Sequence, residues 1–397
     1  MMSIFGDGRT VIWRLTVAQA LVGAHSTTIF ATGAVLGAKL APQPALATLP
    51  VSVMMAGMAG STLPAGVLAE RFGRRAAFMV GAMLGILSGL LGAYAIMVQS
   101  FALFCMATLL AGAFAAIGMT FRFVAAECVP ANAKPRALAT VLAGGVASGL
   151  LGGELATATM NAVPAHQFAG SYLAASATAL AAGVMLLGVG GKGAASTERG
   201  QGRTITQIMG QPLFLVAVTT GAIIYLLMNF LMTSAPLAMR MHGLAQHHAN
   251  TAVQWHVVAM FAPSFVVGWL ISRFGARWIT ASGLVITGLA AIIGLAGETH
   301  MHFLLCLIVL GIGWNFGFAG SSSMILDTHR PEERARAQSA NDFIVFGTVM
   351  IGSFLSGGVL TTYGWYVVCW LTFPPLVIAL AALALFQQAP APQRVRV

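Results

Sequence analysis

The chain has 397 residues, of which 58% are hydrophobic and only 8% are Asp, Glu, Lys or Arg, and its formal net charge is +10. A soluble domain usually carries about a quarter charged residues, so this composition excludes an ordinary soluble protein and indicates one made for lipid. The basic excess could suggest a nucleic-acid-binding protein, but its distribution among the loops, described below, excludes that class as well.

Long apolar runs follow one another along nearly the whole chain. A membrane-spanning helix needs roughly 20 apolar residues. On that rule we predict twelve spans, at 12–37, 46–67, 77–98, 101–125, 137–161, 169–190, 212–238, 250–271, 278–297, 302–326, 339–360 and 364–386. Spans three and four, and spans eleven and twelve, are joined by very short connections. Little of the chain is left for a soluble catalytic domain.

A short cationic motif occurs twice, once after the second span and once after the eighth. Gly66-x-Leu68-x-x-Arg71-Phe72-Gly73-x-Arg75 returns as Gly268-x-Leu270-x-x-Arg273-Phe274-Gly275-x-Arg277. An ion-rich turn at the same place in two halves indicates duplication, and duplicated membrane bundles are typically transporters. The predicted fold is therefore an all-α integral membrane protein made of two pseudo-symmetric six-helix bundles.

The longest polar, Gly-rich segment lies between the sixth and seventh spans. It predicts a flexible cytoplasmic linker over 191–211, between an N-terminal bundle (1–190) and a C-terminal bundle (212–397). Loops on the linker's side of the membrane collect nearly all the Lys and Arg, whereas loops on the other side have only Lys39 and Arg240. Because cationic loops stay in the cytoplasm, both termini are predicted to lie there.

The first copy of the motif, Gly66-Val67-Leu68-Ala69-Glu70-Arg71-Phe72-Gly73-Arg74-Arg75, closely resembles the signature loop between spans two and three of the major facilitator superfamily. The degenerate second copy is also characteristic of that superfamily, and the resemblance covers essentially the whole chain. The segments 311–318, 330–333 and 341–343 are similar to a subset of bacterial facilitators, with relatives among drug-efflux proteins and vitamin permeases, riboflavin permeases included. This implies a monomeric carrier of a small-molecule solute in the bacterial inner membrane, working by alternating access.

The residues of the signature loop also have physical roles that do not depend on the resemblance. Gly66 and Gly73 allow close backbone approach and a tight turn, and a carboxylate at Asp342, where the eleventh span is predicted to begin, is stabilised by the helix N-terminus. The resemblance implies that the loop clamps the two halves together on the cytoplasmic side; the alternative is a static topology anchor. In the second copy Ser272 replaces the acid and Ala276 replaces an Arg, so that loop is expected to contribute less. The predicted gate comprises Gly66, Glu70, Arg71, Gly73, Arg74, Arg75, Arg273, Arg277 and Asp342.

Two ionisable residues inside predicted spans are candidates for proton coupling. Glu154 is the one acidic residue well inside a span, where an ionised carboxylate is costly unless paired, protonated or hydrated. His25 lies near the middle of the first span and could exchange a proton at physiological pH. The alternatives are a structural hydrogen bond for Glu154 and a packing role for His25. Arg122 in the fourth span is either a functional residue of transport or an arginine that snorkels to the membrane surface and anchors the helix. Glu127, five residues later, could neutralise its charge there.

The resemblance implies a solute cavity between spans one, four, seven and ten. Tyr225 and Asn229 share a face of span seven, with Met232 one turn further on, whereas the middle of span four, 111–116, is small and apolar. Aromatic and amide groups without a central cluster of charges suit a largely neutral, planar or amphipathic organic solute. Ordinary helix packing is the alternative. The predicted cavity residues are Gln19, His25, Arg122, Tyr225, Asn229, Met232, Trp314 and Asn315.

The leading interpretation is a secondary transporter, proton-coupled or driven by the solute gradient. A Gly-rich fifth span favours efflux, but Leu150 stands where facilitator antiporters have a characteristic Pro. The alternatives are a facilitated-diffusion uptake permease for a metabolite or vitamin such as riboflavin, and a non-transporting sensor, for which no output domain is seen. An enzyme is disfavoured and an ATP-driven pump excluded, because the sequence has no nucleophile motif, phosphate-binding loop or metal-ligand spacing. No cofactor or metal is expected.

Overall fold

The computed structural model describes residues 8–121, 124–125, 128–130, 134–189, 203–330 and 333–385, and these segments form helices and turns. Helices dominate because a backbone that crosses lipid must satisfy its polar groups within the segment itself. Eleven helices of the described chain are long and apolar enough to cross a membrane, or twelve if one bent pair counts as a single span. The twelve-span prediction is therefore confirmed, with one span broken.

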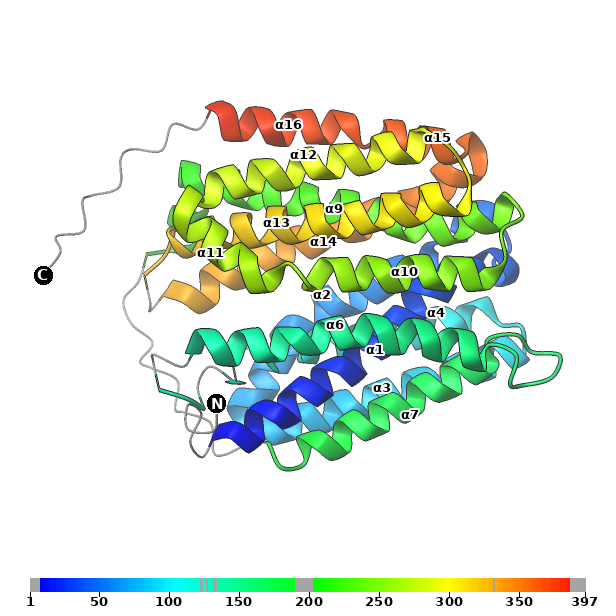
Figure 1. Cartoon of the computed structure of the whole chain (residues 1–397). Helices are drawn as coiled ribbons and strands as arrows, with labels where there is room; N and C mark the ends of the chain where they lie inside the picture. The colour runs from blue at the N-terminus through cyan, green and yellow to red at the C-terminus, as the bar shows by residue number, and fades with distance from the viewer. Residues whose placement is uncertain are drawn as a thin grey trace, which may run out of the picture.

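The first half of the chain forms a bundle of six spans (Figure 1). Its third and fourth spans are joined by only three residues, as predicted. The fourth span is shorter than the predicted 101–125, because the helix ends at Gly118 and a turn follows. The elements are α1 (Arg9–Leu40), η2 (Pro44–Leu46), α2 (Leu49–Phe72), α3 (Arg74–Met97), α4 (Phe101–Gly118), α6 (Lys134–Thr159) and α7 (Ala169–Leu186).

The second half repeats this arrangement and lies beside the first (Figure 1). It comprises α8 (Ile205–Met209), α9 (Pro212–Met241), α10 (Gln246–Phe261), α11 (Ser264–Phe274), α12 (Ala276–Leu295), α13 (His300–Leu326), α14 (Arg334–Tyr363), α15 (Trp365–Trp370) and α16 (Phe373–Leu385). The start of α1 and the end of α16 lie at the same end of the molecule, on the left in Figure 1.

The eighth span differs from its prediction. Instead of one helix over 250–271, α10 and α11 meet at an angle of 42°. Pro263 stands at the break and serves as the N-cap of α11. A proline has no N–H to donate and its ring clashes with the preceding turn, so the helix ends and restarts there.

The two copies of the cationic motif form the same turn. Gly73 (φ 85°, ψ 157°) ends α2 and begins α3, and Gly275 (φ 87°, ψ 149°) ends α11 and begins α12. A side chain is strained at such a positive φ, so glycine is required at both places. The matching backbone angles agree with the predicted duplication.

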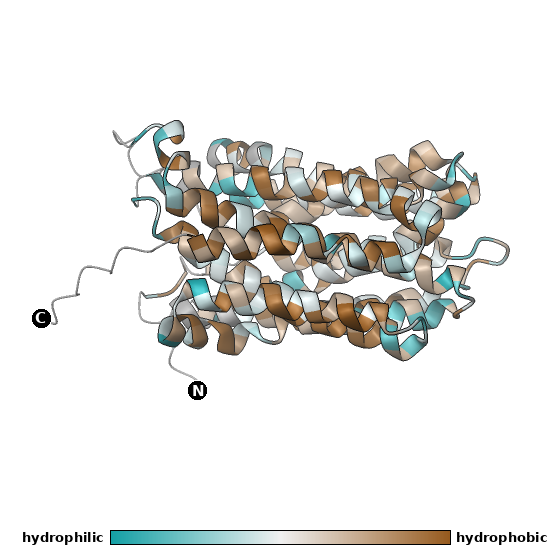
Figure 2. Cartoon of the chain, turned by 90° about the horizontal axis from the view of Figure 1, so that it is seen from above, coloured by the Kyte–Doolittle hydropathy of each residue, from teal (hydrophilic) through white to brown (hydrophobic). Residues whose placement is uncertain are grey.

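The outside of the bundle is apolar, and polar residues gather at its two ends (Figure 2). Met83, Val285 and Val377 are each about 60% exposed on the outer surface (61%, 59% and 61%). Water does not favour so much exposed apolar surface, whereas lipid does. Inside, small residues bring helix backbones together: a Cβ on Gly112 of α4 would meet the carbonyl oxygen of Met54 on α2. These features are those of a multi-pass membrane protein.

Part of the predicted linker is helical. Residues 190–202 lie outside the described segments, but α8 follows, with a capping box between Thr204 and Gln207. Arg203 donates three side-chain hydrogen bonds to Glu333, the shortest from Nη2 to Oε2 at 2.7 Å, and its backbone N–H donates to Oε1 at 2.8 Å. The predicted flexible linker is thus fastened to the C-terminal half from Arg203 onward.

Candidate functional site

A cavity of about 120 Å³ lies where the two halves meet. Span one contributes the largest share of its N-terminal wall, and span seven most of its C-terminal wall. Helices α2, α4, α6 and α10 complete it. The lining residues are Gln19, Val22, Gly23, Ser26, Thr27, Phe30, Met54, Met55, Met58, Ala115, Gly118, Met119, Ser148, Tyr225, Met228, Asn229, Met232, Val257, Met260 and Phe261.

The cavity wall is apolar, flexible and uncharged. Seven of the lining residues are methionines, whose unbranched, polarisable side chains adapt to an irregular or aromatic solute. Polar groups come from Gln19, Ser26, Thr27, Ser148, Tyr225 and Asn229. None of the described lining residues is Asp, Glu, Lys, Arg or His. The chemistry predicted from the sequence, aromatic and amide groups without a cluster of charges, is therefore present.

Asn229 supplies the most distinctive polar atom. Its side chain is fully buried, and its Oδ1 accepts a hydrogen bond from Thr233 Oγ1 at 3.3 Å. Its Nδ2 has no hydrogen-bond partner within the described chain. A buried donor left unpaired costs about 1–3 kcal/mol. A solute that offers an acceptor to this cavity would recover that energy.

An aromatic cluster stands behind the C-terminal wall. The ring of Tyr225 makes edge-to-face contacts with Trp314 (centroids 5.5 Å apart), Phe318 (5.3 Å) and Phe346 (5.6 Å). Trp314 stacks on Phe318 at 5.2 Å. Such pairs hold rings in fixed orientations, so Tyr225 is presented to the cavity on a rigid support.

Four of the predicted cavity residues line the cavity, namely Gln19, Tyr225, Asn229 and Met232. Trp314 does not line it but supports Tyr225. Arg122 and its neighbour Glu127 lie outside the described residues. No residue of span ten lines the cavity, contrary to the predicted set of spans one, four, seven and ten, because Tyr225 and Phe261 stand between Trp314 and the open space.

Asn315 braces the broken eighth span instead of facing solute. Its Nδ2 donates to the carbonyl oxygen of Met260 and to Ser264 Oγ, both at 2.7 Å. These two residues flank the break between α10 and α11, where a backbone carbonyl has lost its helical partner. The prediction that Asn315 lines the cavity was wrong, since its amide is needed to satisfy that carbonyl.

His25 is also placed away from the cavity. Its side chain is fully buried inside the N-terminal half, where Nδ1 donates to the carbonyl oxygen of Ala175 at 3.1 Å and Nε2 lies 3.4 Å from Ser88 Oγ. Phe114 packs edge-to-face against the ring. Although Ser26 and Thr27 face the cavity, the 100° turn per residue points His25 into the bundle. Its predicted place in the cavity was wrong, and these contacts are those of a packing residue.

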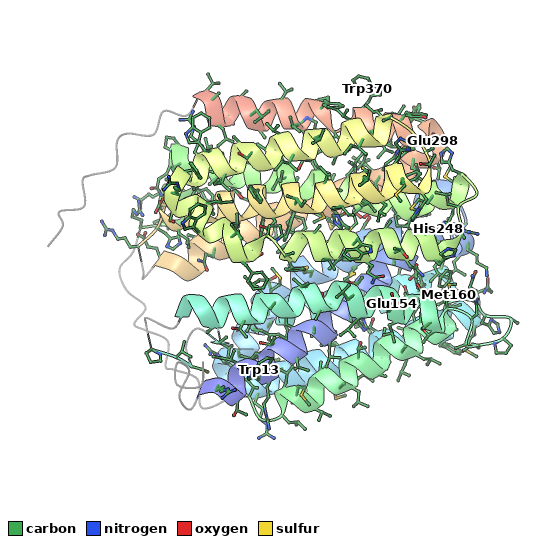
Figure 3. All side chains as sticks on the ribbon, viewed as in Figure 1. Trp13, Glu154, Met160, His248, Glu298 and Trp370 are labelled. Atoms are coloured by element: carbon green, nitrogen blue, oxygen red, sulfur yellow. The ribbon has the colours of Figure 1, made fainter. Side chains whose placement is uncertain are left out.

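Glu154 lies near the end of α6 that is remote from both termini, between α6 and α10 (Figure 3). Its side chain is exposed, not buried as the sequence suggested, and Oε1 accepts a hydrogen bond from Gln254 Nε2 at 3.4 Å. It lies within the fifth span, as predicted, five residues before α6 ends at Thr159. The carboxylate therefore joins the two halves.

Further polar contacts join the halves at the same end of the molecule. Thr48 Oγ1 donates to the carbonyl oxygen of Ser353 and accepts from the backbone N–H of Gly357, both at 2.9 Å. These bonds tie the start of α2 to the last turns of α14.

Helix α10 makes a second set of hydrogen bonds between the halves. Gln246 Nε2 donates to the carbonyl oxygen of Ala31 at 3.3 Å, and Asn250 Nδ2 donates to Thr157 Oγ1 at 3.0 Å. Together with Glu154–Gln254, these bonds define what we call the distal seam: the contacts of Thr48, Ala31, Glu154 and Thr157 with Ser353, Gly357, Gln246, Asn250 and Gln254. The halves are hydrogen-bonded to each other on this side of the cavity.

The predicted gate lies at the opposite end, where the termini are. Gly66 and Gly268, the first glycines of the two motif copies, have open space around them, as does Gly347 of α14. Phe72 and Phe343 are 71% and 70% exposed. The first glycines of the two motif copies and these two phenylalanine rings therefore lie on the open surface of the gate end.

The gate side chains have varied surroundings. Arg71 and Arg75 are exposed, Arg74 is partly buried at the start of α3, and the side chain of Glu70 lies outside the described residues. Asp342 accepts a hydrogen bond from Asn341 Nδ2 at 3.0 Å. It was expected at a helix N-terminus, but α14 begins at Arg334, which places Asp342 about two turns inside the helix.

The second copy of the motif has different partners. Arg277 Nη2 donates to the carbonyl oxygen of Ala384 at 3.3 Å. Arg273 lies over the rings of Trp269 and Phe274. Both residues contact their own half.

Sequence reasoning missed most of the methionines in the cavity wall. Met54, Met55 and Met58 on α2, and Met260 on α10, come from spans that were not expected to contribute. The spacing of Met54 and Met58, and of Met228 and Met232, by one helical turn was a usable signal, because such pairs share a face.

Comparison with known proteins agrees with this geometry. The family model described as Major Facilitator Superfamily matches residues 15–251 and 218–397. The chain is 42% identical over 374 residues to the riboflavin transporter RfnT of Brucella anthropi, an alignment that covers 94% of each chain. It is 27% identical over 370 residues to an uncharacterized MFS-type transporter, YdeG of Bacillus subtilis, covering 88% of this chain and 85% of that one. Among solved structures, the crystal structure of a mutant of the nucleoside transporter NupG superposes with a TM-score of 0.75 at 14% identity. The superposition covers 95% of this chain and 100% of the NupG chain, and it shows likeness of fold alone.

Proposed function

The chain belongs to the major facilitator superfamily and is a membrane transporter, and from this premise we propose that its solute is riboflavin. The observation that carries the proposal is the 42% identity to a riboflavin transporter over 94% of both chains. An alignment of that extent includes every helix that contributes to the central cavity. The chemistry of the cavity supports the same solute.

Riboflavin is uncharged at neutral pH and combines a planar tricyclic ring, bearing two carbonyl groups, with a polyol chain. The methionines and the ring of Tyr225 suit the flat apolar surface. The unpaired Nδ2 of Asn229 suits a ring carbonyl, and the amide of Gln19 and the hydroxyls of Ser26 and Thr27 suit the polyol. Small-molecule sites are typically apolar with a few placed polar groups.

The cavity is too small for this solute in the present conformation. Ligand pockets are typically about 300–1,000 Å³, whereas this one is about 120 Å³. Solute entry therefore needs the halves to move apart. We propose alternating access, in which the hydrogen bonds of the distal seam close one side and the signature loop closes the other.

The charged loops indicate which end of the molecule faces the cytoplasm. We propose that the termini lie in the cytoplasm of a bacterium and the protein in its inner membrane, because Lys and Arg concentrate in the loops on that side. The distal seam is then the outer gate, and the present conformation is closed to the outside. Arg71, Arg74, Arg75 and Asp342 would close the cytoplasmic side in the opposite conformation.

We propose facilitated diffusion as the driving mode, since none of the described cavity-lining residues carries an ionisable acid or a histidine. Proton coupling is a second candidate, favoured by one observation: the Glu154 carboxylate bridges the halves through Gln254. Protonation would weaken that charge-assisted bond and favour opening of the seam.

The experiment is transport of riboflavin into proteoliposomes, followed by flavin fluorescence, with and without an imposed pH gradient. We expect saturable riboflavin uptake that a nucleoside of similar size does not inhibit. Asn229→Ala should lower the apparent affinity, whereas Asn161→Ala, in an exposed loop, should not. Folded, reconstituted protein that moves no riboflavin would reject the proposal. Acceleration by the pH gradient would replace facilitated diffusion with proton coupling.

A further inference from the structure

A second cavity lies outside the transport path. It is a groove of about 660 Å³ formed by α11, α12 and α13 in the C-terminal half, at the end of the molecule that holds the termini. It shares no lining residue with the central cavity. Its wall consists of Leu270, Arg273, Phe274, Trp278, Ile279, Ser282 and Phe316.

Arg273 is the single charge in the described wall of this groove. It is exposed, and its guanidinium lies over the rings of Trp269 (5.9 Å to the centroid) and Phe274 (5.7 Å). Cation–π contacts fix the position of a guanidinium but leave its N–H groups in need of acceptors. No acceptor or acidic partner for Arg273 is found in the described segments.

The sequence explains why Arg273 has no acidic residue directly before it. The first copy of the motif has Glu70 directly before Arg71, whereas the second has Ser272 directly before Arg273. The second copy thus has the cation without the acidic neighbour. The guanidinium is therefore available for an external anion, and an arginine fork matches the geometry of phosphate.

The groove faces the lipid side of the bundle. Trp278 is 68% exposed, and the same stripe of α12 continues through Ser282 and Val285 to Leu289 and Ile292, all exposed. Exposed apolar residues at this spacing form one helix face. In a membrane, acyl chains would cover these residues.

The groove is polar at one end and apolar at the other. Arg273 lies two residues from the turn at Gly275, at the end of the molecule that holds the termini. Phe316 precedes Gly317, which lies against Gly283 of α12, eight residues and about 12 Å along that helix from the turn at Gly275. Aromatic rings at an interface typically sit at headgroup level, and Trp269 and Trp278 flank the arginine.

We propose that this groove binds an anionic phospholipid of the cytoplasmic leaflet, with the phosphate on Arg273 and an acyl chain along Leu270, Ile279 and Phe316. Basic pockets between membrane helices on that side are suited to anionic headgroups. The occupant is a lipid because a free phosphate would leave the apolar end of the groove unfilled. The site goes beyond riboflavin transport and does not depend on it.

The test is native mass spectrometry of the detergent-purified chain titrated with phosphatidylglycerol or phosphatidylcholine. Wild type should retain phosphatidylglycerol in preference to phosphatidylcholine. Arg273→Gln should retain about fivefold less phosphatidylglycerol, the equivalent of the ~1 kcal/mol that one arginine contributes at an anionic surface. Arg240→Gln, an exposed arginine at the opposite end that donates to the carbonyl oxygen of Leu244, should behave as wild type.

A second variant guards against misfolding of the first. Ser272→Glu restores the acid of the first motif copy at an exposed position and keeps Arg273 in place. It should lower phosphatidylglycerol retention while riboflavin binding stays unchanged. Equal retention of the two lipids by wild type, or full retention by both variants, would overturn the proposal. Displacement of phosphatidylglycerol by millimolar inorganic phosphate alone would overturn it too, by identifying a site for free phosphate.

Discussion

Asn229→Leu should separate solute affinity from stability, because the wild-type amide is poorly satisfied in the empty cavity. Leucine has nearly the same size and shape as asparagine but no polar atoms. The substitution removes a buried donor without a partner, which costs about 1–3 kcal/mol, and one hydrogen bond with Thr233, which contributes about 0.5–1.5 kcal/mol. The substitution also leaves the buried Thr233 hydroxyl without a partner, which costs about as much as removal of the unpaired donor gains, so the empty carrier should keep about the wild-type stability.

Riboflavin binding, in contrast, should weaken. In wild type, the Asn229 donor would pair with a ring carbonyl of the solute, whereas in the leucine variant that carbonyl would be buried without a partner. The loss is about 1.4 kcal/mol or more, which is about tenfold in the dissociation constant. Quenching of riboflavin fluorescence measures the affinity, and thermal unfolding of the solute-free protein measures the stability.

Thr233→Val provides the matched comparison. Thr233 is buried but does not line the cavity, and its hydroxyl bonds Asn229 Oδ1 and not Nδ2. This variant should lose stability and keep its affinity for riboflavin. An unchanged affinity in Asn229→Leu, or equal losses of affinity in the two variants, would refute the reasoning.

Riboflavin phosphorylated on its polyol should compete at least about a hundredfold less well than riboflavin in the binding assay. An unpaired charge is costly to bury, and none of the described cavity-lining residues is cationic. Equal competition by the two compounds would contradict this. Glu154→Gln keeps a hydrogen-bond partner for Gln254, so riboflavin exchange should persist while any acceleration by a pH gradient disappears. An acceleration that survives in this variant would show that another group couples transport to protons. His25→Gln should leave the pH profile of transport unchanged but lower the unfolding temperature, since the bond to the carbonyl oxygen of Ala175 is lost; a flattened profile would restore the coupling role. Arg203 holds the pKa of the Glu333 carboxyl below its ordinary 4.5. That stabilisation is complete above 4.5 and is lost as the pH falls toward the lowered pKa, so wild type should lose stability more steeply than Glu333→Gln in acid unfolding below that value, and parallel curves would contradict it.

The sequence by itself determined the number and order of the spans, the two halves and the turns that open the third and ninth spans. These features follow from local rules. A segment in lipid must be apolar and helical whatever surrounds it, and a backbone turn at positive φ, as at Gly73 and Gly275, needs glycine. The aromatic and amide character of the cavity was also readable, from Tyr225 and Asn229 one turn apart.

Only the tertiary structure decided which face of each helix meets the cavity. These helices are apolar on all sides, so hydropathy identifies a span but not its rotation. His25 and Ser26 are neighbours in sequence, yet one is packed inside the N-terminal half and the other lines the cavity. The same is true of helix ends: Asp342 lies about two turns inside α14 and not at its N-terminus, because the point where a helix begins depends on packing at the surface of the bundle. The distal seam, the brace at Asn315 and the lipid-facing groove all join segments far apart in the sequence, and each exists only because folding brings together groups that no local pattern relates.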